Sequence, residues 1–152
     1  MTSKKPLAAL LMILLAAQLG LAQAQATPVG MWKICDPVSG LERLLVRITE
    51  EDGVLSGNVE KILDPAIEPG AVCQKCSGQR KDQRLLGLNL IAGVKPSLDA
   101  AGTWDGGQIL DPNSGKTYSV RLIPASGGKT LAVRGYIGTP MMGRTQTWLR
   151  VD

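Results

Sequence analysis

The chain has 152 residues and a formal charge of +4 at pH 7, and it contains neither histidine nor phenylalanine. The absence of histidine removes the commonest general base and the commonest metal ligand, which argues against most acid–base and metal-dependent catalysis. Lysine and arginine are spread along the chain without a basic run, so the charge does not indicate a nucleic-acid partner.

The first 26 residues have the pattern of a secretory signal peptide. Lys4 and Lys5 precede an apolar run over 7–21, and two overlapping small-x-small cleavage sites occupy 22–26. The run of about 15 residues is shorter than the roughly 20 that a membrane-spanning helix needs. We therefore expect cleavage near Ala24 to Ala26, a periplasmic or secreted location, and no transmembrane segment in the mature form.

The remaining residues, 27–152, are predicted to form one all-β domain. Short apolar stretches alternate with clusters of Gly, Pro, Asp and Asn, which is typical of an antiparallel meander. Alternation with a period of two, as in Tyr118, Val120 and Leu122, predicts strands with one buried face. In chain order the predicted strands span 30–35, 43–50, 54–63, 84–91, 102–110, 117–123, 130–137 and 144–151.

Eight strands joined mostly by short turns favour a small up-and-down barrel, with a strongly bent sandwich as the alternative. A closed barrel of this size has room for packed side chains or for one small ligand. The longest connection, 64–83, contains Cys73 and Cys76 and is predicted to be a long loop of the kind that often carries function.

Three interpretations of Cys73-Gln74-Lys75-Cys76 are open. In an exported protein the pair is expected to be oxidised, and its place in a loop favours a structural disulfide. A redox-active pair would need a helix start, which the sequence after Gly78 does not indicate. Zinc would need further ligands, and only Cys35 remains. Cys35 could instead bond to one of the pair, but its position at a strand end predicts a buried, reduced thiol.

The two ends of the domain carry residues suited to closing a barrel. Gly30-Met31-Trp32 opens the domain, and Trp148-Leu149-Arg150 ends it. The first and last strands of a closed barrel are neighbours, so Trp32 and Arg150 could stack as a cation–π pair. Lipocalins and other calycin barrels begin and end in this way, and the chain resembles them here. In any other β fold, Trp32 and Trp148 would be ordinary core residues.

Longer motifs extend the resemblance. They are a Trp104-to-Pro112 hairpin containing Gly106-Gly107, the Arg134-Gly135-Tyr136 strand, and the Gly143-Arg144-Thr145 start of the last strand. Over 28–150, including the Cys-x-x-Cys loop, the chain resembles the bacterial domain-of-unknown-function family 2147. The resemblance implies an exported, lipocalin-like β-barrel and supplies no reaction or ligand.

The candidate ligand-binding residues are Trp104, Arg134, Tyr136 and Arg144. An inward-pointing Arg134 or Arg144 could hold a carboxylate head group, because a buried charge needs a partner. The alternative is structural: each arginine is paired with an acid such as Asp105 or Asp111, or lies on the outer face.

Two functions follow from these expectations. The first is non-catalytic binding of a small amphipathic or apolar molecule inside the barrel. The second is an interaction or envelope-stability module, without a pocket, that presents the 64–83 loop to a protein partner. An enzyme is not expected, because the chain contains no nucleophile elbow, paired-carboxylate motif or phosphate loop. We predict no catalytic residues, metal or cofactor.

Overall fold

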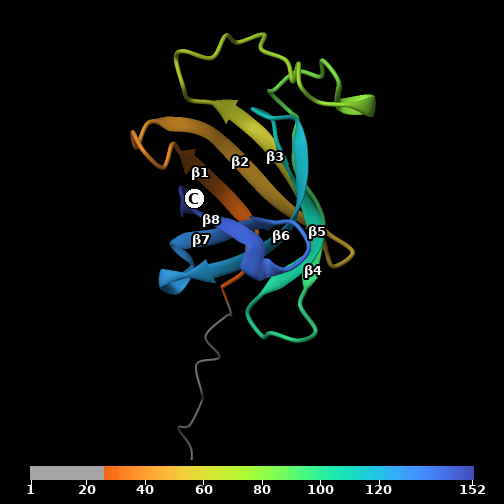
Figure 1. Ribbon diagram of the computed structural model, residues 1–152. Coiled ribbons are helices and arrows are strands. Elements are labelled where there is room, and N and C mark those ends of the chain that lie inside the picture. The colour runs from red at the N-terminus through yellow and green to blue at the C-terminus, as the bar shows by residue number, and fades with distance from the viewer. Residues whose placement is uncertain (1–25) are drawn as a thin grey trace, which may run out of the picture.

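A computed structural model describes residues 26–152, which form a closed antiparallel barrel of eight strands in simple sequence order. The first strand, drawn in orange, lies beside the last, drawn in blue, although they come from opposite ends of the domain (Figure 1). Apart from Ala26, the predicted signal peptide lies outside the described residues. The expected all-β barrel is confirmed.

The strands agree closely with the predicted ones, with one exception described below. Within the described range there is no α-helix, and no helix there is long and apolar enough to cross a membrane. Three short 3₁₀ turns, η1 (Gly78–Arg80), η2 (Ser126–Gly128) and η3 (Pro140–Met142), lie in connections. The strands are β1 (Gly30–Cys35), β2 (Glu42–Glu51), β3 (Val54–Ile62), β4 (Asn89–Pro96), β5 (Trp104–Asp111), β6 (Lys116–Ala125), β7 (Thr130–Tyr136) and β8 (Gly143–Arg150).

The fourth strand was predicted too early, at 84–91 instead of 89–96. Arg84 makes only an isolated bridge to Val72, and Gly87 has a φ of 85°, which takes the chain out of extended geometry. The true strand runs through Gly93 and ends at Pro96, two residues that read as turn signals in the sequence. The β3–β4 loop is therefore longer than expected and extends beyond the end of the barrel (Figure 1).

Gly106 and Gly107 allow a bulge in β5, which lies between β4 and β6 in the sheet. The register between β5 and β6 shifts between Trp104 and Gly107, and Gly106 has a φ of 77°. A side chain at Gly107 would collide with the backbone of β4, since its Cβ would lie 2.4 Å from the Ala92 carbonyl oxygen. Glycine is thus required here by close strand approach.

Tryptophans fill one end of the barrel, which we call the closed end and define by the start of β1 and the end of β8. Trp32, Trp104 and Trp148 are 0%, 7% and 1% exposed. Around them pack aliphatic side chains that alternate along each strand with outward-facing residues, as a period of two requires. Those that are fully buried include Val46, Leu55, Val94, Val120, Leu122 and Leu131.

Arg150 holds the closed end together. Its guanidinium carbon lies 4.3 Å from the centroid of the Trp32 ring. The same group donates hydrogen bonds to the carbonyls of Thr27, Val29 and Gly128 at 2.9, 2.9 and 2.6 Å. One cation therefore ties together the chain before β1, the β6–β7 turn and the end of β8.

The seam between β1 and β8 is short. Trp32 pairs with Arg150 and Lys33 pairs with Leu149, and the Val151 amide donates to the Met31 carbonyl. In the described chain, residues 143–148 of β8 pair with β7 and not with β1. The barrel is thus closed by hydrogen bonds at the Arg150 end and loosened at the other, which we call the open end.

Replacing Arg150 with alanine is expected to lower the free energy of unfolding by about 2–3 kcal/mol, because the variant loses a cation–π contact and three charge-assisted hydrogen bonds. Urea denaturation followed by tryptophan fluorescence measures the change. Lys129→Ala, which removes an exposed cation, is the matched control and should leave the midpoint nearly unchanged. Equal stability of Arg150→Ala and the control would contradict this role for Arg150.

Candidate functional site

The open end of the barrel contains a cavity of about 820 Å³. Residues from β1, β2 and β4 to β8 line it, together with part of the β3–β4 loop. Trp148 lines the cavity on the side of the closed end, whereas Trp32 does not border it. The interior is therefore divided, with packed aromatic side chains at one end and a hollow at the other.

A glycine in the wall helps to keep this hollow open. Gly135 of β7 lines the cavity, on the strand face that also carries the buried Leu131 and Val133. A Cβ at Gly135 would meet Ile109 and Tyr118 at 3.6 and 3.7 Å, which is ordinary contact. The fold therefore does not require glycine here, but any larger side chain would project into the cavity.

Apolar side chains make up one part of the cavity wall. They come from β1, from β5 and β7, and from the β3–β4 loop, and they include Ile34, Ile109, Val133, Ile67, Val72 and Leu85. Such a lining suits a hydrocarbon body, because it offers no hydrogen-bonding partner over most of its surface.

Polar groups line the rest, chiefly on β6, β7 and β8. Tyr118, Tyr136, Arg144 and Gln146 border the cavity. The Gln146 side-chain oxygen accepts a hydrogen bond of 3.4 Å from the Trp148 indole. Among the described residues, no carboxylate forms a salt bridge with Arg144, which is exposed. Arg144 therefore contributes a positive charge to the cavity wall that no described carboxylate neutralises by a salt bridge.

Other charged groups at the cavity are already engaged. Arg43 forms a 2.6 Å salt bridge with the buried Asp64. Asp36 accepts hydrogen bonds from the Ser39 amide and hydroxyl and from the Val38 amide, and these bonds hold its pKa below the ordinary value. Asp36 is therefore ionised and committed to its own turn, and it does not neutralise Arg144.

The four candidate ligand-binding residues do not lie together in the structure. Tyr136 and Arg144 both border the cavity, but Tyr136 follows the inward-facing Gly135, so its side chain lies on the outward face of β7. Trp104 lies instead in the packed closed end, opposite Leu122 of β6. Arg134 follows the inward-facing Val133 and so points outward, where it donates to Thr145 Oγ1 at 2.8 Å and to the carbonyls of Pro140 and Met141.

Three residues of the site were not singled out from the sequence: Tyr118, Gly135 and Gln146. The alternation along β8 could have found Gln146, because residues 144, 146 and 148 share one face of a strand. Asp105, named as a partner for Arg134 or Arg144, pairs instead with Arg121 at 3.2 Å.

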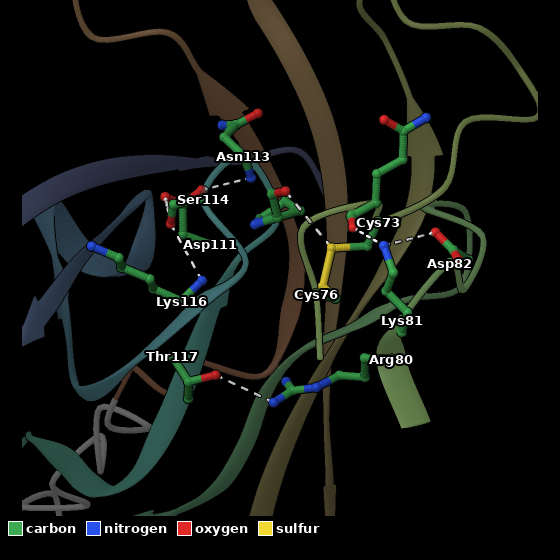
Figure 2. Close-up of a disulfide and its surroundings, with 12 residues drawn as sticks. Cys73, Cys76, Arg80, Lys81, Asp82, Asp111, Asn113, Ser114, Lys116 and Thr117 are labelled. Carbon is green, nitrogen blue, oxygen red and sulfur yellow. Dashed lines mark hydrogen bonds and ion pairs between the residues drawn. A yellow bond between two sulfur atoms is a disulfide. The ribbon is translucent and has the colours of Figure 1, made fainter. Parts of the chain in front are cut away.

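The disulfide of the β3–β4 loop packs against the barrel. Cys73 and Cys76 are bonded and are only 2% and 4% exposed. Figure 2 shows the bond facing the β5–β6 turn, where the Pro112 carbonyl lies 3.7 Å from Cys73 Sγ. A side chain at Gly115 would collide with the Lys75 carbonyl, so loop and turn are in close contact.

Further contacts attach this loop to the barrel. Arg80 donates a 3.2 Å hydrogen bond to Thr117 Oγ1 on β6 (Figure 2). The turn that receives the loop is itself ordered by Asp111, which accepts from the Asn113 amide and the Ser114 hydroxyl at 3.0 and 2.7 Å. The loop therefore forms a stable part of the cavity wall.

These contacts bear on the open interpretations of the cysteines. The bond lies between Cys73 and Cys76, and Cys35 is free. No group of three metal-binding side chains occurs among residues 26–152. The pair precedes the three-residue turn η1 rather than an α-helix, which favours the structural interpretation. Cys35 was expected to be buried but is half-buried, because it lies at the end of β1 beside the cavity.

Comparison with known proteins agrees with this architecture. The structure is similar to that of a protein described as "Protein HP1028 from the human pathogen Helicobacter pylori belongs to the lipocalin family", with a TM-score of 0.70, 18% sequence identity and coverage of 84% of each chain. The fold is therefore a lipocalin-like barrel. No match was found among curated proteins. Residues 30–150 match the family described as "Uncharacterized protein conserved in bacteria (DUF2147)", and the chain belongs to this family.

Replacing Cys73 and Cys76 together with alanine is expected to cost about 2 kcal/mol of unfolding free energy, as a short disulfide-closed loop predicts. Urea denaturation with and without reductant measures it, and reductant should shift the wild type but not the variant. The wild type is expected to show no insulin-reducing activity. Such activity, lost in the variant, would contradict a purely structural bond.

Proposed function

We propose that this protein is an exported, non-catalytic binding protein that holds one small amphipathic molecule in the open end of its barrel. The ligand has an apolar body and an anionic head group, for which a carboxylate is the simplest choice. The observation that carries the proposal is Arg144, a cation without a carboxylate partner in the described chain, at the wall of a cavity that has both an apolar and a polar side.

The size of the cavity supports a small-molecule ligand. Its volume of about 820 Å³ falls within the range of roughly 300–1,000 Å³ that is usual for small-molecule sites. Tyr118 and Gln146 add neutral hydrogen-bonding groups to the same cavity wall. A few convergent polar groups in an apolar wall can orient a molecule whose two ends differ in polarity.

A binding role also agrees with the shortage of side chains that could serve as general acids or bases. Histidine is absent from the whole sequence, and the cavity-lining Asp36 is committed to its own turn. The lipocalin-like barrel is compatible with binding but does not establish it, since fold alone does not determine function. The signal-peptide pattern of residues 1–26 supports a periplasmic or secreted location.

The alternative is an interaction module without a pocket. A barrel filled by side chains from end to end would have favoured it. The hollow beyond Trp148 instead favours a ligand, and the β3–β4 loop packs onto the β5–β6 turn as part of the cavity wall.

Replacing Arg144 with glutamine is expected to weaken binding of a fluorescent fatty acid, dansylundecanoic acid, by about tenfold, equivalent to about 1.4 kcal/mol. The uncharged methyl ester of the same probe should bind both proteins equally, because it cannot form the ion pair. Titration followed by dansyl fluorescence measures both affinities. Lys129→Gln is the control with the same change in net charge.

A second variant tests the place of binding. Gly135→Leu puts a large side chain into the cavity from a position where a Cβ meets only ordinary contacts, so it should fold and lose binding of both acid and ester. If Gly135→Leu binds the probe as the wild type does, the probe lies elsewhere and the proposed site is wrong.

A further inference from the structure

The turn between β7 and β8 exposes three large apolar side chains within six residues. Ile137, Met141 and Met142 are 69%, 90% and 77% exposed. Single exposed apolar residues are normal on protein surfaces, but a group of them marks an interaction site. The turn is ordered rather than loose, because Arg134 donates hydrogen bonds to the carbonyls of Pro140 and Met141.

A second apolar turn lies at the same end of the barrel. In the β1–β2 turn, Val38 and Leu41 are 95% and 61% exposed. Pro37 from this turn and Met142 from the other both line the ligand cavity. The two turns therefore border the mouth of the cavity, where β1 and β8 are not paired. We call these five exposed side chains the apolar rim.

The charge of the adjoining wall indicates what the rim contacts. Near the open end, β6, β7 and β8 carry three cationic side chains, Lys116, Arg134 and Arg144, and no acidic one. In the described chain, no acid forms a salt bridge with any of these three. In the other turn of the rim, Asp36 accepts hydrogen bonds from within that turn, and Glu42 beside it pairs with Lys33.

We propose that the apolar rim docks onto an anionic phospholipid surface, with Met141 and Met142 inserted among the acyl chains. Apolar side chains backed by cations are the combination that binds an anionic bilayer peripherally. Protein interfaces are also enriched in methionine and arginine, so a protein partner is the outcome from which the vesicle experiment must distinguish a lipid surface. This proposal goes beyond the function proposed above, since it concerns the outer surface of the barrel.

The orientation that follows is specific. With the rim in the lipid surface, the mouth of the cavity faces the membrane and the Trp32–Arg150 end faces away from it. An amphipathic molecule could then pass between bilayer and cavity without crossing bulk water.

Sedimentation with lipid vesicles tests the proposal. The mature protein should bind vesicles of phosphatidylglycerol and phosphatidylcholine in equal parts, bind phosphatidylcholine vesicles at least about tenfold more weakly, and be released by added salt. The variant Met141→Asp should lose about tenfold in affinity for the anionic vesicles. Leu98→Asp is the matched control, because Leu98 is 101% exposed on the β4–β5 loop at the other end of the barrel.

Several outcomes would overturn the proposal. They are equal binding by Met141→Asp and the wild type, an equal loss in Leu98→Asp, or equal binding to neutral and anionic vesicles. A concentration-dependent dimer that Met141→Asp abolishes, with no vesicle binding, would assign the rim to a second copy of the chain. Titration of Met141→Asp with dansylundecanoic acid without vesicles keeps the two proposals separate, since Met141 does not line the cavity and cavity binding should be retained.

Discussion

The barrel depends on one contact, the guanidinium of Arg150 against the ring of Trp32. The strands could close in sequence order without it, but β1 and β8 share only a short run of backbone pairing. Arg150 adds to that run a cation–π contact and hydrogen bonds to three carbonyls, drawn from the chain before β1 and from the β6–β7 turn. Because those carbonyls are backbone groups, the contact fixes the path of the chain and not only one side chain.

The rest of the interior follows from the position of this contact. The three tryptophans are buried at the end where Arg150 lies, and the cavity lies at the other end. The tryptophans are at one end, and the sequence contains no phenylalanine. The interior of the other end is therefore filled mainly by aliphatic side chains, and one of its positions is a glycine. The hollow lined by Gly135 and Arg144 is the result. The closure of the barrel at the Arg150 end and the cavity at the open end thus both follow from the concentration of large side chains at one end.

Much of this arrangement could be predicted from the sequence, because strands and turns have local signals. Trp32 and Arg150 could be placed together because closure of an up-and-down barrel makes first and last strands neighbours. The fourth strand was missed because Gly93 and Pro96 have the composition of a turn, whereas Leu85, Leu86 and Leu88 resemble a strand but belong to a loop held by its disulfide. Local composition does not report the tertiary contacts that decide such cases.

The cavity was harder to predict than the fold. Arg134 and Arg144 both lie beside glycine in the sequence. In the structure, Arg134 points outward and donates hydrogen bonds to the β7–β8 turn, whereas Arg144 lines the cavity. They differ because successive side chains of a strand point to opposite faces of the sheet. Which residues point inward depends on where each strand begins, and a shift of one residue exchanges the inward and outward positions. Trp104 likewise lies in a strand whose far end borders the cavity, but its own position is at the closed end.

The most direct test of this account is an isotope-filtered NMR spectrum of the labelled protein with bound dansylundecanoic acid. It records which protons of the protein lie next to the ligand. The account predicts contacts from the ligand to the Trp148 ring and to Gly135, and none to the rings of Trp32 or Trp104. Contacts to Trp32, or only to residues of the outer wall, would contradict a barrel that is packed at the Arg150 end and hollow at the other.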